Sequence, residues 1–577
     1  MNNRFGAAAP AAGWLVAGAI AALALTGCAK NPFATSLDEY GDRPSAERLR
    51  SIDAITLDSN EIEGDLPTER DDVTESQINT LRENPFEGLD TLDISLEEVR
   101  AWTISNNLDI QVALVDPTIA NQSVTEADAA FEAVFFANLN RNSFDTPTSS
   151  TLSGSSVDTT SIDFGVRVPV RTGGNVTVNF PFNRTNTDNS FSTLNPSYTQ
   201  DASISISQPL LRGAGRRSST HGIRVASLNE GVSETRTKQE IIRQLAAADR
   251  LYWRLYAARK SLDVAQQQYE LAMAQLERAR RRVDAGDLPE VEVIRAEDGV
   301  ASRLEDIIVN ENLVLTRQRQ LKRLMNVEGL GQRTEILLVP GSTPDPVRYG
   351  IDADAYVEAA IANRMELLEL ELLLSIDEST IAFERNQALP LFTLDYTYRV
   401  NGLGDSSSSA LGVAREGDFA DWLVGFRAEI PIGNAGAKSR VRSAILTRLQ
   451  RLSSVEAREL SIEQEVLDAI DTIESGWQRI LAARLSSIAA GRTLEAEQRQ
   501  FDVGRRTSTD VLDAATRLAQ AQSSEIAALT DYEIAQIDLA FATGTILGRS
   551  RVDWAPTDPS GDDPGGPVID PDYFTSQ

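Results

Sequence analysis

Residue types that carry chemistry are scarce in this chain. Among its 577 residues there are one cysteine, one histidine and four methionines. One cysteine and one histidine cannot build a zinc cluster, and they argue against a Ser-His-Asp or Cys-His catalytic arrangement. Four methionines provide no methionine-rich track for a soft metal ion. We therefore expect no enzyme activity, no cofactor and no metal site.

Lysine and arginine are also few relative to aspartate and glutamate. The chain has 55 lysines and arginines against 85 aspartates and glutamates, which gives a formal net charge of −30. A strongly acidic chain is repelled by phosphate backbones and by anionic membrane surfaces. Nucleic acid is therefore not an expected partner, and most of the negative charge is interpreted as a solvated surface.

Long apolar runs are missing except at the N-terminus. Arg4 precedes an apolar run over residues 11–25, which is too short to span a bilayer as a helix and ends in Leu25-Thr26-Gly27-Cys28. This pattern predicts a signal peptide over residues 1–27. Its end resembles a bacterial lipobox, so Cys28 would become the acylated first residue, while the alternative is a plain signal peptide with Cys28 lost or left free.

Two stretches of the chain repeat one another at a distance of 218 residues. Residues 283–296 and 501–514 both lead from apolar heptads into a glycine turn, at Gly286 and Gly504, and then into a second apolar helix. A large residue at one seam position and a small one at the next allow two helices to approach closely, as in a left-handed coiled coil. Each copy is predicted to be a helical hairpin with glycine at its tip.

A second pair of repeats lies upstream, at a distance of 257 residues. Residues 105–110 match residues 362–367, and residues 133–135 match residues 390–392. The chain is therefore predicted to be a tandem duplication of helix, strands, long helix, glycine turn and helix. The first copy is longer by 39 residues (257 − 218 = 39), which we assign to an extra hairpin over residues 162–182 at the strand end.

The heptads predict very long helices. They continue over residues 217–283 and 437–501, which corresponds to roughly 100 Å of helix in each copy at 1.5 Å per residue. A return helix is expected over residues 510–547. A further helical segment over residues 96–131 is expected to break near Pro117.

Between the helices, apolar and polar residues alternate. Strands of about 9–11 residues with one apolar and one polar face fit a transmembrane barrel with a wet lumen, although a soluble sandwich shows the same period. One chain offers about four to six such strands, too few to close a water-filled barrel alone. The apolar positions are Ile162, Phe164, Val166, Val168, Val176, Val178, Phe180, Phe182, Phe392, Leu394, Tyr396, Tyr398, Trp422, Val424 and Phe426.

These patterns divide the chain into five parts. After the signal peptide we expect a lipid-anchored polar tether over residues 28–90 and a first repeat over residues 91–336, with strands at about 131–209. A second repeat follows over residues 337–548, with strands at about 390–432, and then a disordered acidic tail over residues 549–577. The predicted fold class is mainly α with a membrane β-barrel.

The duplication and three motifs resemble TolC-type outer-membrane efflux proteins. The motifs are QPLLRG at residues 208–213, IPIG at residues 430–433 and FDVGRRTSTDVLDA at residues 501–514, and the resemblance extends over about residues 92–548. It implies a lipid-anchored homotrimer whose chains share one outer-membrane barrel and continue as a helical tunnel in the periplasm. It also implies partnership with a periplasmic adaptor (membrane fusion) protein and an inner-membrane transporter, so that the trimer is a passive exit duct for efflux or type I secretion.

The resemblance also implies functional residues at the tunnel tip. The gate of the family falls on Glu292, Phe501 and Arg506, and its constriction rings of aspartates fall on Asp510 and Asp513. Glu292 replaces an aspartate and keeps the charge, whereas Phe501 replaces a tyrosine and loses a hydroxyl. We expect a charge-assisted contact between Glu292 and Arg506 to hold the tip shut.

Two alternatives stay open on the residues alone. The polar stripe of Arg506, Asp510, Asp513 and Arg517 lies on one helix face, where intrahelical pairing on a solvated surface is an alternative to a gate. The whole chain could also be a periplasmic coiled-coil adaptor or structural lipoprotein whose strands form a soluble domain.

Overall fold

A computed structural model of the chain describes residues 86–149, 154–555 and 566–569. Cys28, the predicted signal peptide and nearly all of the predicted tether lie outside the described residues. The body begins with strand β1 (Thr91–Ile94), which pairs in parallel with β7 (Leu337–Pro340).

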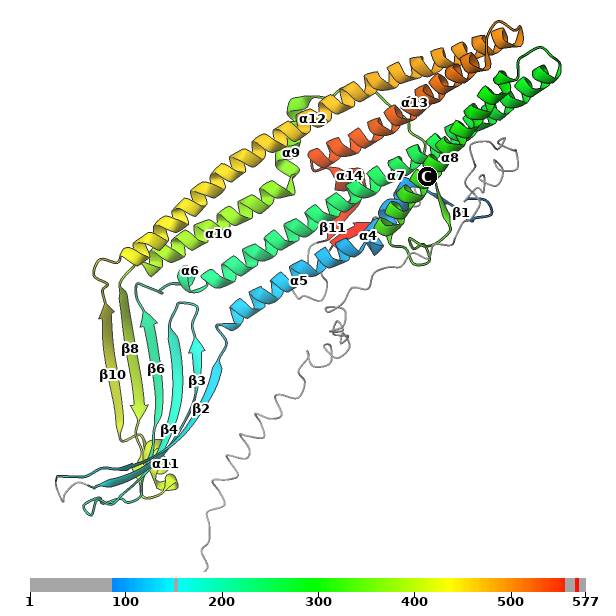
Figure 1. The fold of residues 1–577 in the computed structure, drawn as a ribbon. Coiled ribbons are helices and arrows are strands. Elements are labelled where there is room, and N and C mark those ends of the chain that lie inside the picture. The colour runs from blue at the N-terminus through cyan, green and yellow to red at the C-terminus, as the bar shows by residue number, and fades with distance from the viewer. Residues whose placement is uncertain (1–85, 150–153, 556–565, 570–577) are drawn as a thin grey trace, which may run out of the picture. The chain divides into compact units, whose positions relative to one another are not determined.

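Four long helices form two hairpins. The first consists of α7 (His221–Asp284) and α8 (Val291–Met325), and the second of α12 (Ala435–Asp502) and α13 (Ser508–Ala542). Figure 1 shows them running side by side, and α13 also packs against α7. Their bounds confirm the long helices that the heptads predict.

Shorter helices join these hairpins to the strands. They are α4 (Leu96–Asn106) and α5 (Leu108–Ala129) in the first copy, and α9 (Ala353–Asn363) and α10 (Met365–Gln387) in the second. No helix within the described ranges combines the length and the apolar composition that crossing a bilayer requires.

The break predicted near Pro117 is wrong. The helical segment breaks at Asn107, whose extended backbone ends α4 and whose side chain accepts a hydrogen bond from the Ile110 N–H at 3.0 Å to begin α5. Pro117 is buried inside α5, which packs along α7. Packing therefore outweighs the backbone hydrogen bond that proline removes.

The duplication is confirmed by backbone conformation. Left-handed residues recur 218 positions apart, at Gly215 and Gly433 before the long helices and at Gly286 and Gly504 in the tips. Element starts recur 257 positions apart, at 96 and 353 for α4 and α9 and at 134 and 391 for β2 and β8. The two copies thus share both their helices and the turns that connect them.

The end of the chain departs from the prediction of a disordered tail. After α14 (Ile546–Arg549), strand β11 (Val552–Ala555) pairs antiparallel with β12 (Gly566–Ile569). Val552 is buried in the main hydrophobic core, which gives this part of the tail a reason to be ordered.

The strands form one antiparallel sheet with the order β10-β8-β6-β4-β3-β2. Two short strands, β5 (Ser197–Gln200) and β9 (Leu403–Gly404), extend it next to helix α11 (Ser407–Glu416). The main strands are β2 (Val134–Asp145), β3 (Ser156–Pro169), β4 (Asn175–Thr187), β6 (Ala202–Pro209), β8 (Leu391–Val400) and β10 (Ala420–Glu429).

The extra hairpin lies in this sheet and not along the helices, as predicted. It consists of β3 and β4, and it stands between β2 and β6 (Figure 1). Among the strands that the structure describes, β2 and β10 have a partner on one side only, so the sheet they bound is open.

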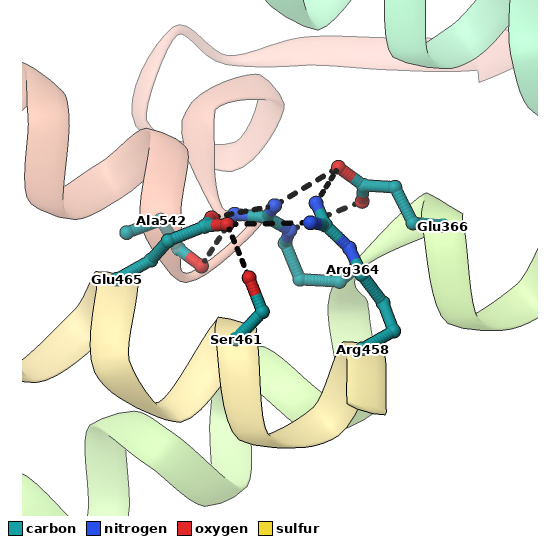
Figure 2. A network of polar contacts seen from close by, with 6 residues as sticks. All are labelled: Arg364, Glu366, Arg458, Ser461, Glu465 and Ala542. Carbon is teal, nitrogen blue, oxygen red and sulfur yellow. Dashed lines mark hydrogen bonds and ion pairs between the residues drawn. The ribbon is translucent and has the colours of Figure 1, made fainter. Parts of the chain in front are cut away.

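An ionic network around one buried arginine ties the second copy together (Figure 2). Arg364, between α9 and α10, is 4% exposed and donates to the Ala542 carbonyl in the last turn of α13 at 3.1 Å. Its guanidinium also pairs with Glu366 at 2.9 Å and with Glu465 of α12 at 2.8 Å. Arg458 of α12 contacts the same two carboxylates at 3.0 and 3.3 Å. Three helices are therefore joined through one guanidinium.

The first copy contains the same connection in neutral form. Asn107 stands 257 positions before Arg364, and its side-chain amide donates to the Leu324 carbonyl at 2.9 Å. Leu324 in turn stands 218 positions before Ala542, in the last turn of α8. In both copies, the junction of the short helices is fixed to the end of the return helix.

The network makes the stability of the second copy depend on pH. Burial raises the pKa of Glu366, but its backbone hydrogen bond and the charges of Arg364 and Arg458 outweigh burial and hold the pKa below its usual value of 4.5. Because the folded-state pKa is the lower one, this stabilisation is present above pH 4.5 and is lost as the pH falls through the folded-state pKa.

Replacing Arg364 should destabilise the protein. In Arg364→Met the buried Ala542 carbonyl loses its donor, while Glu366 and Glu465 keep Arg458 as a partner, so we expect a loss of about 1–3 kcal/mol in unfolding free energy. The control Arg236→Met removes an arginine that is 63% exposed and paired with Glu369, and it should cost about 0–1 kcal/mol. Denaturant unfolding in detergent measures both, and equal costs would refute the role of the network.

Candidate functional site: the tips of the helical hairpins

Both hairpins end in the same turn. Gly286 and Gly504 have φ of +76° and +73°, in the left-handed region that glycine adopts without strain. Their N–H groups donate to the carbonyls of Val283 and Phe501, each at 2.9 Å. The N–H of the next residue bonds to the carbonyl five residues back in both copies, which completes a Schellman motif. The predicted tip glycines therefore end α7 and α12 in the same way.

Phe501 joins the two tips. Its ring is 1% exposed and packs with Leu494 and Val511. The Arg282 guanidinium of α7 lies 5.2 Å from the ring centroid and donates to the Phe501 carbonyl at 2.8 Å. A cation over an aromatic face, combined with a charge-assisted hydrogen bond, attaches the end of α7 to the end of α12.

Glu292 makes the second connection between the hairpins. Its side chain in the first turn of α8 is buried, and one carboxylate oxygen accepts the Ser508 N–H at 2.9 Å. The other oxygen pairs with Arg295 at 2.7 Å. Ser508 is the first residue of α13, where free N–H groups and the helix dipole favour a negative charge. Glu292 therefore stabilises the start of α13 from the neighbouring hairpin.

The predicted contact between Glu292 and Arg506 does not form within this chain. Arg506 turns toward α12, where it pairs with Glu497 at 3.0 Å, and it lies 3.7 Å from Asp510. Glu292 is instead occupied by Ser508 and Arg295, which lie closer to it. Each of the two residues has another partner within the chain.

The two predicted ring aspartates differ in their surroundings. Asp510 forms a capping box with Thr507, whose N–H and hydroxyl both donate to its carboxylate at 2.9 Å. These bonds, the backbone one first, lower the pKa of Asp510, and the charge of Arg506 adds to the effect. Asp513 is exposed and makes no hydrogen bond or ion pair with the described part of the chain. Asp510 thus has a local structural role, whereas Asp513 is available to solvent.

Sequence reasoning did not identify Arg282, Arg295 or Ser508. Arg282 carried one signal, because its counterpart in the second copy, 218 positions later, is Gln500. This signal alone does not single out Arg282, because Arg280 aligns in the same way with Gln498 but pairs at 3.0 Å with Glu297 inside its own hairpin.

Comparisons with known proteins agree with this architecture. A family model described as "Outer membrane efflux protein" matches residues 175–327 and 356–545. The outer membrane protein TolC of Vibrio cholerae is 24% identical over 318 residues, which are 55% of this chain and 70% of that protein. TolC of Escherichia coli strain K12 is 23% identical over 360 residues, or 60% of this chain and 69% of that protein.

A solved structure shares the fold. The outer-membrane channel OprN superimposes with a TM-score of 0.60 at 16% identity, covering 78% of this chain and 90% of that one. Paired long helices joined to an antiparallel sheet are thus common to this chain and a known outer-membrane channel.

Removing the Glu292 carboxylate should loosen the start of α13. In Glu292→Ala the buried Ser508 N–H loses its acceptor, so we expect amide hydrogen exchange over residues 505–512 to accelerate about tenfold or more. Glu292→Gln keeps an oxygen and should change the rate less. Glu290→Ala, an exposed neighbour without a side-chain cap, is the control. Unchanged exchange in Glu292→Ala would show that the contact does not hold the helix end.

Proposed function

Because the chain belongs to the outer membrane efflux protein family, we propose that it forms the exit duct of a tripartite efflux or type I secretion system. The duct would move solutes passively across the periplasm and the outer membrane. Proteins of this family are channels, and the proposal assigns no covalent chemistry to any residue.

The observation that carries the proposal is an open sheet with a bare apolar face. Phe135 on β2 and Trp422 on β10 are 57% and 70% exposed. A soluble protein seldom leaves such a face uncovered, whereas a lipid-facing barrel requires it. A soluble strand domain in an adaptor or structural lipoprotein would need another layer on this face, and no second sheet covers it within the described residues.

The open edges support a homotrimer. In lipid, every backbone N–H and carbonyl needs a partner, so β2 and β10 must pair with other copies of the sheet. We infer a homotrimer with one shared barrel, in which β10 of each chain pairs with β2 of the next. Cys28, acylated in the outer membrane, would anchor each chain in addition.

The hairpin tips would then meet the partners of the duct. Helices α7 and α12, of 64 and 68 residues, extend about 100 Å from the sheet end, well beyond a bilayer. We place the tips in the periplasm, where they would contact an adaptor protein and, through it, an inner-membrane transporter.

We assign closure of the tip to the two connections between hairpins. Opening a tunnel lined by these helices requires the hairpins to separate, and this would break the Arg282–Phe501 and Glu292–Ser508 contacts. Arg506 would support Phe501's helix through Glu497 and would not bridge to Glu292. Asp513, exposed in each of three chains, would attract cations to the lumen, and Asp510 would contribute less because Thr507 occupies its carboxylate.

Single-channel conductance of the reconstituted full chain tests the duct and its gate together. Arg282→Ala and Glu292→Ala should raise the open probability, because losing about 1–3 kcal/mol of closed-state contacts shifts the equilibrium by about 5- to 150-fold. Arg499→Ala is the control, since this residue is 76% exposed and pairs only within its own helix, with Glu495.

The outcomes separate the duct from the gate. A protein that fractionates away from the outer membrane and forms no pores would refute the duct. Pores whose opening is unchanged in both tip variants would refute only the gate, and an effect confined to Arg506→Ala would transfer the gate to that residue.

A further inference from the structure

The two copies contribute unequal numbers of strands to the sheet. The second copy supplies β8 and β10, whereas the first supplies β2, β3, β4 and β6. We propose that the β3–β4 hairpin is part of the barrel wall, so that the trimer closes a barrel of eighteen strands whose mouth is wider than the duplicated unit alone would make it. This inference rests on the proposed trimeric duct.

Strand pairing places the hairpin inside the wall. β3 pairs with β2 along the whole of β2, from Val134 to Asp145, and with β4 from Val157 to Pro169. β4 pairs in turn with β6, from Asn175 to Asn179. Since β2 contacts the rest of the sheet only through β3, a hairpin outside the wall would leave β2 with no neighbour in its own chain.

The hairpin also continues the apolar face of the sheet. Phe164 and Val166 are 39% and 37% exposed, almost the same as Tyr396 and Tyr398 at 39% and 40%. One row in register crosses all six strands with apolar residues only: Phe135, Val166, Val178, Ile204, Tyr398 and Trp422.

The opposite face of the hairpin is polar, like that of β6 and β8. In the adjacent row, Arg167 on β3 and Thr177 on β4 align with Ser205 on β6 and Thr397 on β8. A hairpin that plugged the lumen would be wet on both faces. One apolar and one polar face match a strand pair that separates lipid from water.

The turn of the hairpin is built into the junction with the helices. Arg171 pairs with Asp128 of α5 at 2.6 Å, and the Thr172 carbonyl accepts the Gly215 N–H at 3.0 Å. A Cβ at Gly173, whose φ is +91°, would lie 2.1 Å from the Gly213 carbonyl oxygen, so only glycine fits. β3 and β4 therefore reach the same level as the strands that continue into helices.

An added pair of strands preserves the closure of the barrel. Successive strands in the sheet are antiparallel, so β2 and β10 run in opposite directions and can pair between chains. With one extra strand the two edge strands would run in the same direction, whereas with two extra strands they remain antiparallel. Six strands from each of three chains give eighteen.

The added strands widen the mouth substantially. With strands about 4.8 Å apart and tilted by about 40°, eighteen strands enclose a backbone diameter of about 36 Å, against about 24 Å for twelve. Selection by size would then rest at the helical tips, and the mouth would admit solutes at least about half as wide again as a twelve-stranded barrel.

Polymer exclusion measures this width from the outer side, independently of the closed tip. We would compare the full chain with a variant lacking residues 149–187, the 39 extra residues, using polyethylene glycols of increasing size to block conductance. We expect the radius of the largest polymer that enters to fall at least about 1.5-fold in the variant. Equal limits in two trimers that both form pores would overturn the proposal.

Cysteine labelling tests the same point without a deletion. In a Cys28→Ser background, Arg167→Cys should react with a water-soluble maleimide and reduce conductance, as should Thr397→Cys on β8. Val166→Cys should be protected by lipid, as should Tyr398→Cys. If the deletion variant does not assemble, this pattern decides alone, and equal labelling at positions 166 and 167 would overturn the proposal.

Positions 397 and 398 on β8 serve as controls that distinguish failure of the hairpin proposal from failure of the proposed duct. If positions 397 and 398 alternate as expected and positions 166 and 167 do not, the duct stands and the hairpin lies outside the wall. If the β8 positions fail to alternate, or the native chain forms no trimer, the proposed duct itself has failed.

Discussion

The constraint on which the rest of this structure depends is that the backbone groups of a sheet cannot stay unpaired in lipid. The chain presents a sheet with apolar residues on one face and free edges at β2 and β10. A barrel shared between copies satisfies both edges at once. In the proposed trimer the long helices would surround a common axis, and the hairpin tips of the three chains would come together where a partner or a gate could act.

The duplication separates the structural features that both copies share from those that only one copy has. Asn107 and Arg364 fix equivalent junctions to equivalent carbonyls, and Gly286 and Gly504 form equivalent tips. Two features without a counterpart have a proposed role. They are the β3–β4 hairpin, which would widen the wall, and Arg282, which bridges the two tips where the other copy has Gln500.

Periodicity predicted most of the fold, whereas side-chain partners could not be predicted. Heptads and period-two alternation extend over many residues, so the ends of α7 and α12 and the strand faces agree closely with expectation. The break expected at Pro117 does not occur, because burial of this residue where α5 packs on α7 outweighs the backbone hydrogen bond that proline removes. Glu292 has several cations and a helix N-terminus within reach, and the choice between them depends on rotamers and packing. Val552 is a short apolar signal within a polar tail, and only its place in the core reveals it.

Cross-linking of the sheet edges tests the shared barrel most directly. Within one chain, β2 and β10 are five strand spacings apart, about 24 Å, which is too far for a disulfide. In a Cys28→Ser chain we would combine Trp422→Cys on β10 with a cysteine at Phe135, Ala137 or Leu139 on β2 and oxidise it in the outer membrane. If three chains share one barrel, we expect cross-linked species of two and three chains and none larger. The absence of cross-links at every pair, or a series that continues beyond three chains, would contradict it.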